Sequence, residues 1–176
     1  MKKNKAIILD RDGTINVEKN YVFKISDFEF IKNTFEAIKI FNDLGYKVII
    51  ITNQSGIGRG YFTKHDLCKL NEYILKIAKS NECKIDEFYY CPHYNIECNC
   101  RKPKLGLYEK AIEDFNIDVK NSWAVGDKTT DLIGPNKLNM KTVLVLTGYG
   151  KSEKPLSNTK VFENLYDFAV NLKKGL

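Results

Sequence analysis

The chain has 176 residues, of which 43% are hydrophobic and 28% charged, so it fits one globular domain of ordinary size. Its net charge of +6 fits either a lysine-rich solvated surface or attraction of an anionic partner, such as nucleic acid or a phosphorylated metabolite. No apolar stretch is long enough to cross a bilayer, and the apolar run after the basic N-terminus ends at Asp10, too early for a secretory signal. We therefore expect a cytoplasmic location, no membrane partner and a monomer.

Short apolar and β-branched runs predict five strands, at residues 6–9, 48–52, 88–90, 123–125 and 142–146. Apart from 88–90 they are almost continuously apolar, which is typical of parallel strands covered by helices on both faces.

Helical patterns lie between these strands. Asn33 is a candidate N-cap for a helix that stops near Gly45. Thr63 and Asp66 predict a capping box at the start of a second helix. Two further helices are predicted at 108–115 and 165–173.

The alternation of strands and helices predicts a Rossmann-like, three-layer α/β fold with a central parallel sheet. Residues 1–176 are expected to form a single domain. The segments between the first strand and first helix, and around the second helix, contain too little unassigned chain for a large cap domain. In such sheets ligands bind beyond the carboxyl ends of the strands.

Two carboxylates, Asp10 and Asp12, directly follow the first predicted strand. Residues at i and i+2 of an extended segment point the same way, so both side chains can face one pocket. Paired carboxylates repel unless a cation or a shared proton lies between them, and Mg²⁺ favours oxygen ligands of this kind. An aspartate there can also attack phosphorus. Considered alone, the segment is explained equally well as a polar Asp-Gly turn.

Polar and basic groups follow later elements of the predicted sheet. Thr52, Asn53 and Ser55 end the second strand, where hydroxyl and amide groups suit phosphate oxygens. Arg101 and Lys102 precede the helix at 108–115, and their cations could neutralise a transferring phosphoryl group. The first set is also typical of a helix cap, and the second of a solvated basic run.

Asp127 follows the fourth strand, and Asp131 lies one helical turn further on. Asp127 is in position to be a further magnesium ligand, and Asp131 to support it. Both could instead cap a helix, which is routine for aspartate.

Four candidate metal ligands lie within ten residues: Cys91, His93, Cys98 and Cys100. Three thiolates and an imidazole complete a tetrahedral zinc site, which leaves no open position for catalysis and so predicts a structural role. The total of five cysteines is odd, which argues against a closed set of disulfides. Unliganded reduced cysteines are the alternative interpretation. Zinc in the loop 91–100 would hold the adjacent Arg101 and Lys102 in place.

Together these motifs resemble those of the haloacid dehalogenase superfamily of phosphatases, in which a carboxylate pair, a hydroxyl residue, a lysine and a further carboxylate occur in this order. The resemblance spans Asp10 to Asp131. Segments within 12–31 and 52–63 further resemble the branch that acts on D-glycero-D-manno-heptose 1,7-bisphosphate. This implies Mg²⁺-dependent removal of the C7 phosphate, leaving heptose 1-phosphate, in the synthesis of nucleotide-activated heptose for lipopolysaccharide or surface polysaccharide.

The resemblance also implies a role for each candidate residue. Asp10 would attack the phosphoryl group and form an aspartyl-phosphate, while Asp12 would protonate the departing sugar oxygen and later deprotonate the hydrolytic water. The magnesium ligands would be Asp10, the backbone carbonyl of Asp12, and Asp127. The phosphoryl charge would be stabilised by Thr52, Arg101 and Lys102. The substrate would be bound by Glu18, Tyr21, Asn53, Ser55 and Lys128.

Two other functions stay open from the sequence. Histidinol-phosphate phosphatase shares the mechanism, the Cys–His cluster and the Arg-Lys-Pro segment. The four residues between His93 and Cys98 form a loop that is usually longer in the heptose branch and shorter in the histidinol one, so the exact sugar is left open. A zinc-dependent nucleic-acid-binding module would explain the basic charge, but the carboxylates would repel a phosphate backbone. We therefore expect a small phosphorylated sugar as the partner, and no nucleic acid.

Overall fold

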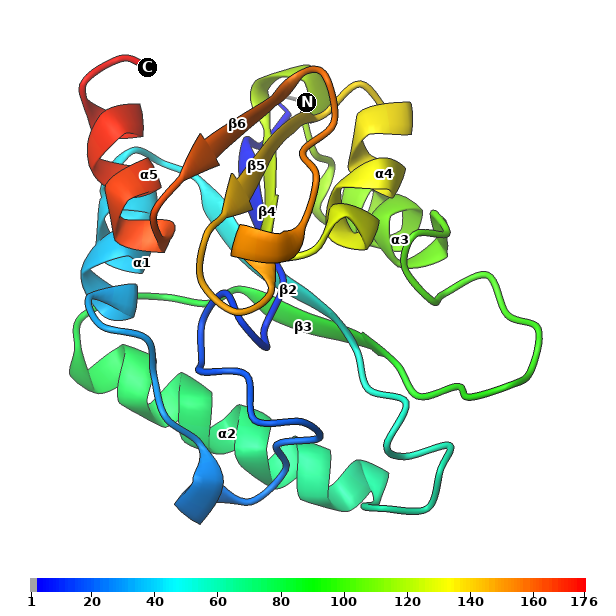
Figure 1. Ribbon diagram of the computed structural model, residues 1–176. Coiled ribbons are helices and arrows are strands. Elements are labelled where there is room, and N and C mark those ends of the chain that lie inside the picture. The colour runs from blue at the N-terminus through cyan, green and yellow to red at the C-terminus, as the bar shows by residue number, and fades with distance from the viewer. Residues whose placement is uncertain (1–2) are drawn as a thin grey trace.

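A six-stranded parallel sheet forms the centre of the computed structural model, which describes residues 3–176. Its strand order is β3-β2-β1-β4-β5-β6 (Figure 1). The strands are β1 (Ala6–Leu9), β2 (Lys47–Asn53), β3 (Glu87–Cys91), β4 (Trp123–Gly126), β5 (Lys141–Val145) and β6 (Thr159–Phe162).

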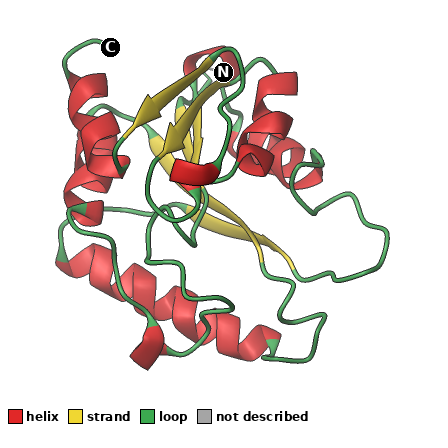
Figure 2. Ribbon diagram, viewed as in Figure 1, coloured by secondary structure: helices red, strands yellow, loops and turns green. Residues whose placement is uncertain are grey.

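Helices cover both faces of the sheet, as the ribbon coloured by secondary structure shows (Figure 2). The helices are α1 (Thr34–Asp43), α2 (Lys64–Ser80), α3 (Gly106–Phe115), α4 (Thr129–Lys137) and α5 (Leu165–Lys173). Residues of α1, α2 and α5 pack in one apolar cluster, and residues of α3 pack in another on the opposite face. In β1, Ile7 and Leu9 join the first cluster and Ala6 and Ile8 the second, because alternate side chains of a strand point to opposite faces. The three-layer α/β fold predicted from the sequence is confirmed.

Most predicted elements occur where the sequence placed them. All five predicted strands are present with ends shifted by at most one residue, and α5 has the predicted bounds. The capping box of α2 is formed: Thr63 Oγ1 accepts from the Asp66 N–H at 3.2 Å, and Asp66 Oδ2 accepts from the Thr63 N–H at 2.8 Å. Gly45 has a φ of +77° after α1, the conformation in which glycine ends a helix.

Three local features differ from the sequence prediction. Asn33 precedes α1, but its φ is +63° and its side chain makes no capping hydrogen bond. The start of α1 is fixed instead by Thr34, whose hydroxyl donates to the Ile15 carbonyl at 3.1 Å. Neither β6 nor α4 was predicted, because β6 is an edge strand with exposed residues and α4 contains Pro135 and lacks a clear apolar stripe.

The connections near the carboxyl ends of the strands are short. Between β1 and α1, the described chain contains only one turn of 3-10 helix, Ile25–Asp27, and β2 is followed by a loop that leads directly into α2. No large cap therefore lies over the sheet in residues 3–176. Within the same residues, none of the helices has both the length and the apolar character needed to span a membrane.

Candidate active site

The carboxyl ends of the central strands meet around a pocket of about 410 Å³. Ten of the residues that the sequence assigned to catalysis or substrate binding line it: Asp10, Asp12, Glu18, Tyr21, Thr52, Asn53, Ser55, Arg101, Lys102 and Lys128. Asp127, the remaining predicted magnesium ligand, is fully buried at the end of β4. The structure thus brings the predicted residues together, while the role of each stays a prediction.

The local sequence places the Asp10 carboxylate at the floor of this pocket. Asp10 follows β1, a central strand, and its N–H donates to the Val125 carbonyl at 2.9 Å. The next turn requires glycine at position 13, because its φ is +85° and a Cβ there would lie 2.1 Å from Oδ2 of Asp127. The chain can therefore bend tightly over Asp127 without filling the space around it.

Lys102 is the buried cation of the pocket floor. Its ammonium donates to Asp10 Oδ1 at 2.6 Å and to the Ile51 carbonyl at 2.8 Å, and it lies 2.7 Å from Asp131 Oδ1. Burial opposes the charged form, but the carboxylates of Asp10 and Asp131 raise the pKa of Lys102 above its ordinary value. The ammonium therefore stays charged, with all three of its hydrogens directed at acceptors.

Three buried carboxylates form a candidate cation site beside Lys102. Asp10, Asp127 and Asp131 each offer an oxygen, and these atoms lie within 4.8 Å of one another. Burial raises the pKa of Asp10 to about 8, opposed by Lys102 and assisted by the other carboxylates. Burial also raises the pKa of Asp127 to about 7; the hydrogen bond from the Tyr149 N–H opposes this rise, and the Asp131 charge adds to it. Such a group of carboxylates is stable in its ionised form only with further positive charge nearby.

The hydrogen bonds indicate which oxygens are available to a metal. Both Asp131 oxygens are occupied, one by Lys102 and the other by the Lys128 N–H at 3.0 Å. In Asp127, Oδ2 accepts from the Tyr149 N–H at 2.8 Å, but the buried Oδ1 has no partner in the structure. An unpartnered buried carboxylate oxygen is costly. The donor set therefore fits Mg²⁺: Asp127 has an oxygen to offer the ion, whereas both oxygens of Asp131 are taken by Lys102 and Lys128.

Asp12 lies beside the cation site in a different environment. Its carboxylate pairs with the fully buried Arg11 guanidinium at 2.9 Å and accepts from Asn16 at 3.1 Å and from Gln54 at 3.0 Å. Burial would raise the pKa of Asp12, but Arg11, by charge and hydrogen bond, and the two amides lower it below its ordinary value. Without substrate, Asp12 is therefore a carboxylate held in one orientation.

Two predicted residues make contacts that the sequence did not reveal. Asn53 bonds the backbone of Lys102 on both sides of its amide: Oδ1 accepts from the Lys102 N–H at 3.0 Å, and Nδ2 donates to the Lys102 carbonyl at 3.2 Å. Thr52 Oγ1 accepts from Gln54 Nε2 at 2.9 Å. Asn53 thus fixes the segment that carries Lys102, whether or not it also contacts substrate.

Three further residues of the site were not assigned a role from the sequence. Arg11 and Gln54 both donate hydrogen bonds to Asp12. Each lies within a predicted motif in which the neighbouring residues were the candidates. Tyr149 lines the pocket from the loop after β5. A charged residue between two candidate catalytic aspartates was a usable signal for Arg11. Tyr149 gave none, because only the folded loop brings it near Asp127.

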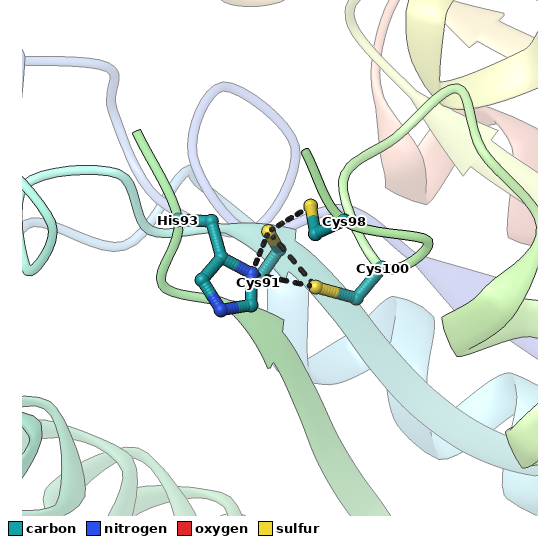
Figure 3. Close-up of side chains that lie close together, drawn as sticks. All are labelled: Cys91, His93, Cys98 and Cys100. Atoms are coloured by element: carbon teal, nitrogen blue, oxygen red, sulfur yellow. Dashed lines mark hydrogen bonds between the residues drawn. The ribbon is translucent and has the colours of Figure 1, made fainter. Parts of the chain in front are cut away.

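The predicted zinc ligands point toward one another at the end of β3 (Figure 3). Cys91 Sγ lies 3.8 Å from Cys98 Sγ and 3.2 Å from Cys100 Sγ, and His93 Nδ1 lies 3.1 Å from Cys100 Sγ. With Zn–S bonds of about 2.3 Å, sulfurs at the corners of a tetrahedron lie about 3.8 Å apart. The four side chains are therefore close enough to surround one zinc ion.

The loop that carries this cluster is bonded to the pocket walls. The Gln54 N–H donates to the Cys91 carbonyl at 2.7 Å, and the Gly58 N–H donates to the Pro92 carbonyl at 2.9 Å. Arg101 Nη1 donates to the His93 carbonyl at 3.3 Å. The conformation of the loop that carries the Cys–His cluster therefore helps to set the positions of Arg101 and of the loop after β2.

Comparison with known proteins gives a consistent family. A family model described as HAD-hydrolase-like matches residues 99–168. The D-glycero-beta-D-manno-heptose-1,7-bisphosphate 7-phosphatase of Haemophilus ducreyi is 44% identical over 82% of this chain and 84% of its own length. The D-glycero-alpha-D-manno-heptose-1,7-bisphosphate 7-phosphatase of Campylobacter jejuni is also 44% identical, over 82% of this chain and 83% of its own.

The fold agrees with these relatives. The crystal structure of D,D-heptose 1,7-bisphosphate phosphatase from B. bronchiseptica, complexed with magnesium and phosphate, matches this one with a TM-score of 0.91 and 29% identity. The match covers 98% of this chain and 99% of that one.

Proposed function

The chain belongs to the haloacid dehalogenase family of phosphatases, and on that premise we propose that it removes the C7 phosphate of a D-glycero-D-manno-heptose 1,7-bisphosphate. The observation that carries the proposal is the pocket floor, where the carboxylate of Asp10, the buried ammonium of Lys102 and the unpartnered Oδ1 of Asp127 meet. The relative named for the beta anomer and the relative named for the alpha anomer are each 44% identical to this chain over the matched region. Their names supply the proposed substrate class.

The proposed reaction begins with Asp10. Its carboxylate attacks phosphorus, the bond to the sugar oxygen breaks, and an aspartyl-phosphate forms. Lys102 and Arg101 balance the charge of the phosphoryl oxygens from the floor and wall of the pocket, and Thr52 contributes its hydroxyl. Water then attacks the aspartyl-phosphate, which releases phosphate and restores Asp10.

Asp12 is proposed to move the protons of both steps. It protonates the departing sugar oxygen and then deprotonates the hydrolytic water. The pairing with Arg11 favours the ionised form of Asp12. A bound phosphate adds negative charge beside it, which raises a carboxylate pKa and moves Asp12 toward the protonated form that the first step needs.

Two metals fit the residues present. Magnesium would be held by Asp10, the backbone carbonyl of Asp12, and Asp127, and when bound it supplies positive charge to the phosphoryl oxygens. Zinc would be held by Cys91, His93, Cys98 and Cys100 and would fix the loop before Arg101.

The substrate is proposed to lie between the loops that carry Glu18 and Tyr21, Asn53 and Ser55, and Lys128. We further propose that residues 1–176 act as one domain. The five cysteines of the described chain form no disulfide, which suits the reducing cytoplasm that we propose as the location.

A rate comparison tests this proposal. Purified protein is assayed with both anomers of heptose 1,7-bisphosphate, heptose 7-phosphate, histidinol phosphate and p-nitrophenyl phosphate, with Mg²⁺ and with a chelator. We expect Mg²⁺-dependent turnover and the highest kcat/KM for one heptose bisphosphate. A preference for histidinol phosphate would overturn the sugar assignment, and activity unaffected by the chelator would overturn the magnesium site.

A further inference from the structure

Lys128 is held between an aromatic ring and a carboxylate at the wall of the pocket. Its ammonium lies 4.2 Å from the ring centroid of Tyr149 and 3.6 Å from Oε2 of Glu18. All three residues line the pocket: Lys128 lies in the segment after β4, Tyr149 in the loop after β5, and Glu18 in the loop after β1. A cation at this distance over a ring is attracted by the negative face of its π system.

The backbone of Tyr149 is anchored at the pocket floor. The Tyr149 N–H donates to Asp127 Oδ2 at 2.8 Å, and two residues earlier Thr147 Oγ1 donates to the Gly13 carbonyl at 2.6 Å. A Cβ on the intervening Gly148 would lie 2.1 Å from Asp127 Oδ2, so the loop lies directly against the pocket floor. The backbone that carries the ring is therefore anchored to Asp127, while 41% of Tyr149 is exposed.

Lys128 differs from Lys102 in how many of its N–H donors are free to bind an anion. Lys102 directs its three hydrogens at Asp10, Asp131 and the Ile51 carbonyl on the floor. The side chain of Lys128 is 37% exposed, and its one ion pair is the long contact with Glu18. The aromatic ring attracts the ammonium without accepting a strong hydrogen bond from it. Lys128 therefore keeps N–H donors for an anion in the pocket.

We propose that Tyr149 is a positioning residue that holds the Lys128 ammonium toward the phosphate that is not cleaved. The inference rests on the proposed function, since it requires a substrate with a second phosphate. The cleaved group is bound at the floor by Asp10 and Lys102, and Lys128 lies on the wall, where the far end of a bisphosphate would be. An interaction at that end that is equally strong in the ground state and the transition state strengthens substrate binding and so lowers KM.

The test compares a bisphosphate with a monophosphate in variants of Tyr149. Tyr149→Phe keeps the ring, and Tyr149→Leu removes it. We expect Tyr149→Leu to raise the KM for heptose 1,7-bisphosphate by about 3- to 30-fold, the range that a cation–π contact provides, with kcat nearly unchanged. The KM for heptose 7-phosphate should not change, and Tyr149→Phe should behave as the native chain does. Equal losses on both substrates, or a Tyr149→Phe variant as weak as Tyr149→Leu, would overturn the inference.

A double-mutant cycle with Lys128→Met shows whether the ring acts through the ammonium. Lys128→Met alone should raise the KM for the bisphosphate selectively, and Tyr149→Leu should then add no further effect. Additive effects would assign the ring a separate role and overturn the inference. The Lys128→Met variant also tests the inference if Tyr149→Leu folds poorly. If Lys128→Met shows no effect specific to the bisphosphate, the inference is wrong.

A matched control is available at the other end of the sheet. Lys5 Nζ lies 4.4 Å from the ring centroid of Tyr46, which precedes β2 and is far from the strand ends that form the pocket. Tyr46→Leu removes a similar contact and should leave both KM values unchanged. If the native chain itself shows no preference for the bisphosphate, the proposed function fails and the inference with it. If the preference is present but insensitive to Tyr149, the inference alone fails.

Discussion

The ammonium of Lys102 lies 2.6 Å from the carboxylate of Asp10, although 92 positions separate the two residues in the chain. The side chains are 2% and 9% exposed, so their attraction is little weakened by water. Lys102 opposes the rise in the pKa of Asp10 that burial causes. The cation expected to bind phosphate therefore also helps to keep the nucleophile ionised.

Replacement of Asp10 by asparagine should abolish turnover. An amide cannot attack phosphorus, and removal of a covalent nucleophile typically costs more than about 10³-fold in rate. Turnover of p-nitrophenyl phosphate and mass spectrometry of acid-quenched protein should show neither product nor phosphoryl-enzyme. Asp12→Asn should still accept some phosphate from this substrate, whose leaving group needs little protonation. Near-native activity of Asp10→Asn would contradict the mechanism.

Replacement of Lys102 by methionine should reduce both activity and stability. It leaves Asp10 and Asp131 buried without their cation, and breaking a buried pair costs about 3–5 kcal/mol. Urea unfolding should measure this loss. The control is Lys110→Met, which breaks the surface pair with Asp114 and should change the unfolding free energy by less than about 1 kcal/mol. Equal effects of the two substitutions would contradict the central role of Lys102.

The stability of the metal-free protein should fall as the pH rises. Burial raises the pKa of Asp127 from 3.8 to about 7 and that of Asp10 from 3.8 to about 8. Between these limits the folded state binds protons that the unfolded state has released, so the stability that these groups contribute is present at pH 4 and lost by pH 8. Unfolding midpoints in chelator should therefore decrease from pH 5.5 to pH 8.

Added Mg²⁺ should have the opposite pH dependence, because it binds the ionised carboxylates. The stabilisation that Mg²⁺ gives should be small at pH 5.5 and largest near pH 8. Asp127→Asn removes one carboxyl with a raised pKa and one proposed metal ligand. In this variant the unfolding midpoint in chelator should fall less with pH, and Mg²⁺ should stabilise the protein less. A gain from Mg²⁺ that is independent of pH would place the ion elsewhere.

The fold could be predicted from the sequence where burial is greatest. The run Ala6–Leu9 is apolar throughout because helices cover both faces of the sheet there. Edge and surface elements carry less information: Thr159–Phe162 exposes its middle residues, and Thr129–Lys137 contains a proline. Their position is decided by packing against β5, which no local pattern records.

The site could be predicted where topology alone brings residues together. Asp10, Thr52 and Asp127 lie at the carboxyl ends of neighbouring parallel strands, so their convergence follows from the strand order. The contacts of Asn53 with Lys102 and of Tyr149 with Lys128 depend instead on the path of loops. Loop paths are set by contacts between distant segments, such as Gly148 against Asp127, and no local pattern in the chain indicates such contacts.

The Cys–His cluster should contain one zinc per chain. Elemental analysis of protein purified without added metal should show it, and Cys98→Ala should lose the metal. Activity should fall with it, because Arg101 bonds the His93 carbonyl. Cys68→Ala provides the matched control, since Cys68 is an exposed free thiol outside the cluster and should retain both zinc and activity. A fully active preparation without zinc would contradict the structural role.

The last prediction concerns which phosphate leaves. Asp10 is 9% exposed at the floor of a pocket of about 410 Å³, so the phosphorus must descend below the surrounding loops to reach it. A primary phosphate at the end of the C7 arm can do so more easily than one attached directly to the sugar ring, since the ring would meet the walls at Glu18 and Tyr21 first. Phosphorus NMR of the products should therefore show free phosphate and an intact anomeric phosphate. Release of the anomeric phosphate first would mean that the substrate binds in the reverse direction, while the aspartyl mechanism would still apply.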